Sequence, residues 1–181
     1  MRAIVSGMTD TFVAFLVAHA AETAPHTGGG LLDHLLGTAA LLRQWGARET
    51  LVRAGLFHSV YGTESYRNVV VPPTLRGEVR ALVGEEAEAI VWRFGAMEKD
   101  SLYANLSRAH TYSITDRFSG ETCPLSSAEL ADQYELTVAN WLEQRPRVPA
   151  NLRGHRQAEL LAMRPRLSPG ACAAIEEAYA G

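Results

Sequence analysis

Two histidines inside apolar helical patterns constrain this chain more than any other feature of its sequence. His34 lies in the sequence LLDHLLGT, residues 31–38, and His58 lies in LFHSVYGT, residues 56–63. Burying an imidazole among leucine side chains costs free energy unless a partner, a metal ion or a ligand binds its nitrogens. We therefore expect each histidine to belong to a polar site within a helical core.

Apolar residues recur at helical spacing along most of the chain, and no alternating strand pattern is found, so the sequence predicts an all-α fold. Residues 64–74 contain two adjacent prolines and predict a long loop beside His58. The first expected helix starts at Thr9 or Asp10. Ser126 or Ser127 is expected to cap a helix over 126–144. The other expected helices are 31–45, Glu49 toward Gly62, 75–94, one within 102–112, 151–163 and 169–179.

Length and composition favour one soluble domain, because 181 residues that are 47% hydrophobic and 20% charged can form a full core. A net charge of −3 leaves no basic surplus for binding nucleic acid. The apolar segment 12–21 is too short to span a bilayer, so we expect no membrane partner. Cys123 and Cys172 lack metal-binding or redox spacing, which fits a protein of the reducing cytoplasm.

The spacing of the two histidines predicts that they converge. His34 lies on one helix and His58 at the end of the next, and antiparallel neighbouring helices would bring their nitrogens within about 7 Å. Two imidazoles form half of a transition-metal site, and His26 could add a third nitrogen. Side chains that could add an oxygen ligand are Asp116, Asp132, Glu135 and Asn140.

A helical histidine followed by a second histidine that closes a helix resembles the HD-domain superfamily of metal-dependent phosphohydrolases and its oxygenase branch. His26, the two histidine sequences, VGEEAE at 83–88 and ANWLEQ at 139–144 resemble more closely an uncharacterised HD-like family, over about residues 20–147. This resemblance implies an HD-like helical bundle over residues 1–147. Residues 148–181 would then form a helical extension that packs on the same domain.

The chain departs from the HD pattern at both expected aspartates. In HD domains an aspartate that binds metal follows the second histidine, whereas this chain has Ser59. The distant aspartate of the motif aligns best with Asn140, and Asp132 is an alternative on the same helix. Because two anionic ligands are replaced by neutral groups, two-metal phosphoester hydrolysis is disfavoured.

These residues lead to three interpretations. We favour a small-molecule enzyme with a histidine-centred pocket, either metal-dependent and similar to iron oxygenases or lyases, or metal-free and acting by acid–base chemistry. The alternative is a non-catalytic HD-like module that binds a nucleotide or an anionic metabolite. In the third, the protein is a structural helical subunit whose histidines are satisfied core residues.

The candidate residues follow from the same pattern. Any metal would be Fe or Mn, because imidazole suits iron better than magnesium. The high alanine, arginine and glycine content suggests a bacterial protein of specialised metabolism, cytoplasmic and either a monomer or a homodimer. The candidate catalytic residues are His34, His58 and Tyr61, the candidate metal ligands are His26, His34 and His58, and the candidate ligand-binding residues are Thr63, Arg76, Arg80 and Asn140.

Overall fold

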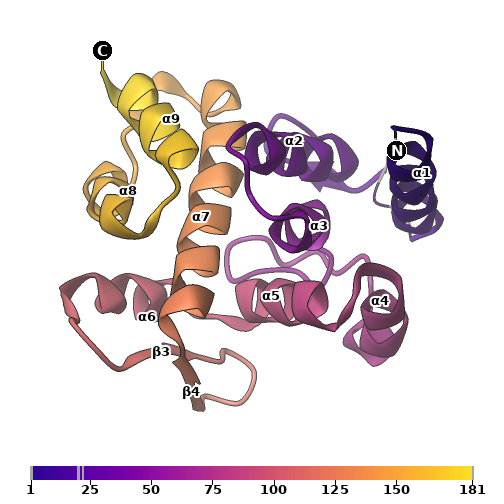
Figure 1. Cartoon of the computed structure of the whole chain (residues 1–181), viewed down its shortest axis with the longest axis horizontal. Helices are drawn as coiled ribbons and strands as arrows, with labels where there is room; N and C mark the ends of the chain where they lie inside the picture. Colours follow the sequence, from indigo (N-terminus) through magenta and orange to yellow (C-terminus); the bar gives the residue numbers. More distant parts are fainter. Residues whose placement is uncertain (1, 20, 22, 181) are drawn as a thin grey trace.

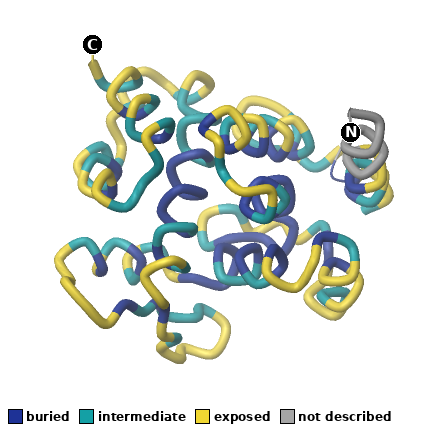
Figure 2. The backbone as a smooth tube through the Cα atoms, viewed as in Figure 1, coloured by how far each residue is buried: buried dark blue, intermediate teal, exposed yellow. Residues whose placement is uncertain are grey.

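Helix α7 (Ser127–Gln144) runs through the middle of the molecule, and the other helices are arranged around it (Figure 1). The structure is a computed structural model that describes residues 2–19, 21 and 23–180, with side chains described from residue 10 onward. The backbone of α7 starts at the predicted capping box, in which Ser126 and Glu129 each accept a hydrogen bond from the other's backbone amide. The buried backbone, dark blue in Figure 2, is concentrated where α7, α3 and α5 meet.

Helices α2 (Leu31–Gln44) and α3 (Glu49–Phe57) confirm two of the predicted helices and form a close antiparallel pair. Their closeness depends on Gly55, because a Cβ at this position would lie 2.5 Å from Cδ1 of Leu42. The start of α2 therefore lies beside the end of α3. This pairing places the two helical histidines at the same end of the hairpin.

Helix α1 (Arg2–Ala18) begins earlier than predicted. The sequence suggested a start at Thr9 or Asp10, which are both good capping residues. The structure instead places them inside the helix. The residues before them include no proline, which would interrupt a helix.

The predicted helix over 75–94 is two helices, α4 (Arg76–Val83) and α5 (Glu85–Ala96). Gly84 lies between them with φ +95°, a conformation that a helix does not contain and that glycine adopts without strain. The break lets α5 turn against α3 and α7 while α4 lies at the edge of the molecule (Figure 1).

The part of the chain before α7 contains short strands that the sequence pattern did not predict. Helix α6 (Lys99–Tyr103) and a following 3-10 turn replace the helix expected within 102–112. After them β3 (Tyr112–Thr115) pairs antiparallel with β4 (Thr122–Leu125), and β1 (Pro25–His26) pairs with β2 (Gly29–Gly30) ahead of α2. Strands this short show too few alternations to be recognised. The fold is 64% helix and 8% strand, so it is mostly helical but not strictly all-α.

The C-terminal segment contains α8 (Gln157–Ala162) and α9 (Pro169–Tyr179). Helix α9 has its predicted bounds, whereas the helix expected at 151–163 is shortened by 3-10 turns. Leu160 and Ile175 belong to the same apolar core as α7, and a domain boundary at residue 147 stays a prediction. Among the described residues no helix combines the length and the apolar character needed to cross a bilayer.

Candidate functional site

The structure brings the two helical histidines together where three helices meet. His34 lies on α2, His58 follows the last residue of α3, and Asn140 lies on α7. The Nε2 atoms of the two histidines are 3.0 Å apart, and Oδ1 of Asn140 is 3.0 Å from each of them. The prediction that the imidazoles approach within about 7 Å is confirmed. We call these three side chains the triad.

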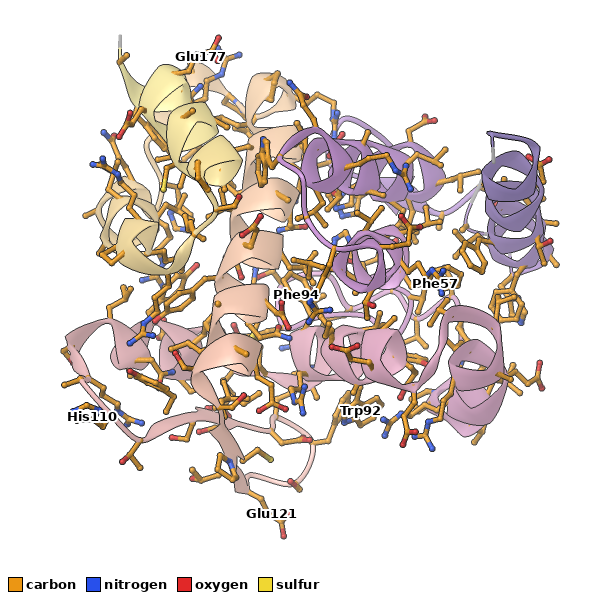
Figure 3. All side chains as sticks on the ribbon, viewed as in Figure 1. Phe57, Trp92, Phe94, His110, Glu121 and Glu177 are labelled. Carbon is orange, nitrogen blue, oxygen red and sulfur yellow. The ribbon has the colours of Figure 1, made fainter. Side chains whose placement is uncertain are left out.

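His58 contributes an unprotonated nitrogen to the triad. The side chain is 0% exposed, and the ring of Phe94, labelled near the centre of Figure 3, packs edge-on against it at 5.1 Å between centroids. Burial, reinforced by the neighbouring His34, lowers the pKa of His58 to about 3, so the ring is neutral near pH 7. Its one proton lies on Nδ1, which donates to the carbonyl oxygen of Gly55 at 2.7 Å. Nε2 is therefore an acceptor.

Asn140 presents an oxygen rather than an amino group. Nε2 of Gln144 donates to the backbone carbonyl of Asn140 at 2.9 Å, and a carbonyl oxygen can only accept. The same amino group lies 3.1 Å from the Asn140 side chain, so the atom that it meets is the acceptor Oδ1. Thr27 fixes the other end of Gln144 by donating to its Oε1 at 2.9 Å.

His34 is oriented by a carboxylate. Its Nδ1 donates to Oε2 of Glu143, to which Arg147 also donates at 2.6 Å. Burial alone would raise the pKa of Glu143, but the hydrogen bonds from His34 and Arg147 outweigh it and lower this pKa to about 2. Because the ionised carboxylate only accepts, Nδ1 of His34 carries a proton. The triad then consists of three acceptor lone pairs, unless His34 Nε2 is protonated too.

Three acceptors at mutual distances of 3.0 Å repel one another unless a cation lies between them. The spacing suits a single metal ion, since two ligand atoms about 2.1 Å from an ion and at right angles to each other lie about 3.0 Å apart. Metal-binding histidines also donate their second nitrogen to a carboxylate or a carbonyl, as His34 and His58 do here. Within the described residues no three His, Cys, Asp or Glu side chains form a metal group, so this site depends on the amide of Asn140.

His26 does not complete a three-histidine metal site, which corrects the sequence prediction. Its ring stacks on that of His34, with centroids 4.1 Å apart and planes 8° apart. Nitrogen lone pairs lie in the ring plane, so the lone pairs of two stacked rings point along parallel planes and cannot meet at one ion. Burial, then the neighbouring His34, lowers the pKa of His26 to about 4. Its buried Nδ1 has no hydrogen-bond partner among the described residues.

Tyr61, Arg76 and Arg80 lie in a separate cluster around Glu88, so their assignment to the histidine site was wrong. The Glu88 carboxylate is 1% exposed and accepts from Arg76 at 2.7 and 3.1 Å, from Arg80 at 3.5 Å and from the Tyr61 hydroxyl at 3.3 Å. Burial, then the charge of Glu88, raises the pKa of Tyr61. These side chains satisfy one buried carboxylate, and the hydrogen bonds that they make lead to Glu88 and not to the triad.

The other candidate oxygen ligands are also occupied elsewhere. Asp132 pairs with Arg48 at 2.6 Å, and Glu135 accepts from the backbone amide and the hydroxyl of Ser168 at 3.1 and 2.8 Å. Asp116 accepts from two backbone amides of its own turn. Of the oxygen ligands considered from the sequence, Asn140 is the one that the structure brings to the histidines.

Two adjoining cavities lie beside the triad. The inner cavity, about 120 Å³, is lined by Thr63 as predicted, together with His26 and Ser59. The outer cavity, about 350 Å³, lies between α6, α7 and the segment leading to α8. The residues that line both cavities are Ser65, Lys99, Asn140 and Gln144. A molecule bound in the inner cavity would therefore contact Asn140 of the triad.

Sequence reasoning missed Glu143, Gln144 and Lys99. Glu143 and Gln144 follow Asn140 by three and four positions, which is the spacing of neighbours on one helical face, so α7 itself carried a signal for them. Lys99 had a different signal in the composition. It is the only lysine among the 17 lysine and arginine residues of the chain.

Comparison with known proteins adds a partial family match. Residues 15–99 match the model of a family described as a domain of unknown function, DUF6817. The match covers less than half of the chain and includes His26, His34, His58 and Lys99, but not Asn140. No curated protein and no solved structure matches the chain.

The contact between α2 and Glu143 leads to a stability prediction. A Cβ at Gly37 would lie 2.8 Å from Cγ and 2.9 Å from Oε1 of Glu143. Gly37→Ala should therefore displace this carboxylate from His34 and lower the free energy of unfolding by about 1–3 kcal/mol. Gly77→Ala, on α4 with open space around its Cβ, should instead stabilise by about 0.5–1 kcal/mol. Urea unfolding measures both, and equal stabilisation by the two substitutions would contradict the close contact.

Proposed function

We propose that the protein is a small-molecule enzyme with a mononuclear metal centre, held by Nε2 of His34, Nε2 of His58 and Oδ1 of Asn140. The observation that carries this proposal is the convergence of three acceptor atoms at 3.0 Å, with both histidines oriented through Nδ1. Iron is proposed because two of the three donors are imidazole nitrogens, and manganese because the third is the harder amide oxygen of Asn140. A divalent ion held by neutral ligands would supply a Lewis acid and lower the pKa of a bound water.

The chain's own residues would position a substrate beside this centre. Asn140 joins the triad to the cavities, and His26, whose buried Nδ1 has no hydrogen-bond partner among the described residues, lines the inner cavity. Phe94 covers His58 and helps to exclude water. Ser59, 2% exposed, lines the inner cavity where an HD enzyme would have its bridging aspartate, which argues for one ion rather than two.

We further propose that this centre is an HD-type metal site with fewer anionic ligands. Two helical histidines and a residue of α7 at the position aligned with the distant aspartate meet at one point, which supports the resemblance. The free thiols of Cys123 and Cys172 support the proposed cytoplasmic location.

Metal titration of the full chain tests the proposed centre. After chelator treatment, the wild-type protein should bind one equivalent of Mn²⁺, or of Fe²⁺ under anaerobic conditions, in isothermal titration calorimetry. His34→Gln, His58→Gln and Asn140→Ala should each weaken binding at least ten-fold. His110→Gln is the matched control, since His110 is exposed and lies away from the helices of the triad (Figure 3).

Two results would overturn the metal centre. One is the absence of stoichiometric binding, and the other is unchanged binding in both triad histidine variants. In the first case a proton on Nε2 of His34 lies between the acceptors instead, and the carboxylate of Glu143 balances the charge of the imidazolium. The site would then act by acid–base chemistry or as a binding module.

A further inference from the structure

The two cavities beside the triad adjoin each other, because Ser65, Lys99, Asn140 and Gln144 line both of them. The rings of Tyr103 and Trp141 belong to the lining of the outer cavity. The inner cavity is lined mostly by polar side chains and ends beside Asn140. This arrangement suits a molecule with an organic part in the outer cavity and a polar group toward the triad.

Lys99 supplies a positive charge that lines both cavities. Its backbone amide donates to Glu64 at 3.1 Å, but no hydrogen bond or ion pair of its ammonium group is found among the described residues. Arg156, the other cation of the outer cavity, is already paired with Asp100 at 2.8 Å and Glu159 at 2.9 Å. Burial lowers the pKa of Lys99, and the charge of the nearby Glu64 carboxylate opposes this shift without cancelling it.

The identity of this residue also carries information. The chain uses arginine at every other basic position and a lysine only here. An ammonium group is a compact point charge, whereas a guanidinium is a wide planar fork. A lysine therefore places a compact charge beside both the inner cavity, of about 120 Å³, and its neighbour.

The triad adds no negative charge that could serve as the partner of Lys99. Its three ligand groups are neutral, and the nearby Glu143 is already bound to His34 and Arg147. With a divalent ion in place, the pocket would be more positive still. Of the two carboxylates that line the outer cavity, Asp100 is paired with Arg156, and Glu64 offsets the burial of Lys99 only in part. Charge complementarity at Lys99 therefore favours an anionic ligand.

We propose that the adjoining cavities bind a small organic anion, with its carboxylate or phosphate group held by the ammonium of Lys99 and its organic part against Tyr103 and Trp141. This inference rests on the proposed function, because it names the substrate class of the same pocket. The anionic group would lie between Lys99 and Asn140, next to the metal centre.

Calorimetric titration of metal-stripped full-length protein with benzoate and benzamide tests the proposal, because the two probes share a shape and differ in charge. Benzoate should bind at least ten-fold more tightly than benzamide. Lys99→Gln should remove this difference, whereas Arg108→Gln, at an exposed arginine outside the cavities, should preserve it. A comparison of the affinities of phenyl phosphate and benzoate shows whether the site prefers a phosphate or a carboxylate group.

A second measurement locates the contact and does not depend on a variant. Because the chain has one lysine, reductive methylation with ¹³C-formaldehyde gives a single lysine signal in addition to that of the terminal amine. Benzoate or phenyl phosphate should shift the Lys99 signal in a saturable way, and benzamide should not.

The proposal is overturned if neither anion binds more tightly than benzamide, if the preference survives Lys99→Gln, or if the lysine signal is unchanged at saturation. None of these measurements uses a metal. A failure here therefore leaves the metal titration of the triad to be judged separately.

Discussion

The Asn140→Asp variant is expected to bind Mn²⁺ or Fe²⁺ at least ten-fold more tightly than the wild-type chain. The substitution keeps the shape of the side chain and places a carboxylate oxygen 3.0 Å from each histidine Nε2. Gln144 can still donate to that oxygen, so the orientation of the side chain is preserved. The new ligand set of two imidazoles and one carboxylate is the one typical of mononuclear iron sites.

Calorimetric titration of chelator-treated protein measures this gain, and Asn151→Asp provides the matched control. It makes the same change of charge at an exposed position and should leave metal affinity unchanged. Adding Ser59→Asp to Asn140→Asp should raise the affinity further, since Ser59 lines the inner cavity beside the triad. If Asn140→Asp gives no gain, the three acceptors do not surround an ion, and the acid–base interpretation replaces the metal centre.

The sequence was sufficient to predict the elements that form the triad. Apolar periodicity located α2, α3 and α7, and the capping box at Ser126 set the register of α7. His34 and His58 lie within apolar stripes, so helix packing buries them and each then needs a polar partner in the core. Their convergence followed from the pairing of the two helices. The position of Asn140 came from the family resemblance and not from periodicity.

Pairing between charged side chains could not be predicted in the same way. Periodicity shows that Arg76 and Arg80 lie on one helix, but it does not show that Gly84 breaks the helix and returns α5 against them. That turn brings Glu88 to both arginines. Tyr61 joins the same carboxylate because its hydroxyl needs a buried acceptor. Assignment of these residues to a ligand therefore required the long-range contacts.

The second large effect is expected in the Glu88 cluster, where Arg76→Met should lower the free energy of unfolding by about 3 kcal/mol. Arg76 donates two hydrogen bonds to Glu88, at 2.7 and 3.1 Å, and its guanidinium stacks on Trp92 at 3.8 Å. Without it, a carboxylate that is 1% exposed keeps, among the described residues, the Tyr61 hydroxyl at 3.3 Å and Arg80 at 3.5 Å. The loss thus comes mainly from leaving a buried charge with weak partners.

Comparison with other variants of the cluster separates this explanation from a simple loss of contacts. Glu88→Gln should be less destabilising, at about 1 kcal/mol, because it removes the buried charge and keeps an acceptor for Tyr61. Arg80→Met should lower stability by less than about 1 kcal/mol, since Arg80 is 49% exposed and its contact is long. The double variant Arg76→Met plus Glu88→Gln should be more stable in urea than Arg76→Met alone. A larger loss for Glu88→Gln than for Arg76→Met would show instead that the ion pair itself stabilises the fold, and unchanged metal affinity in all four variants would confirm that this cluster is separate from the triad.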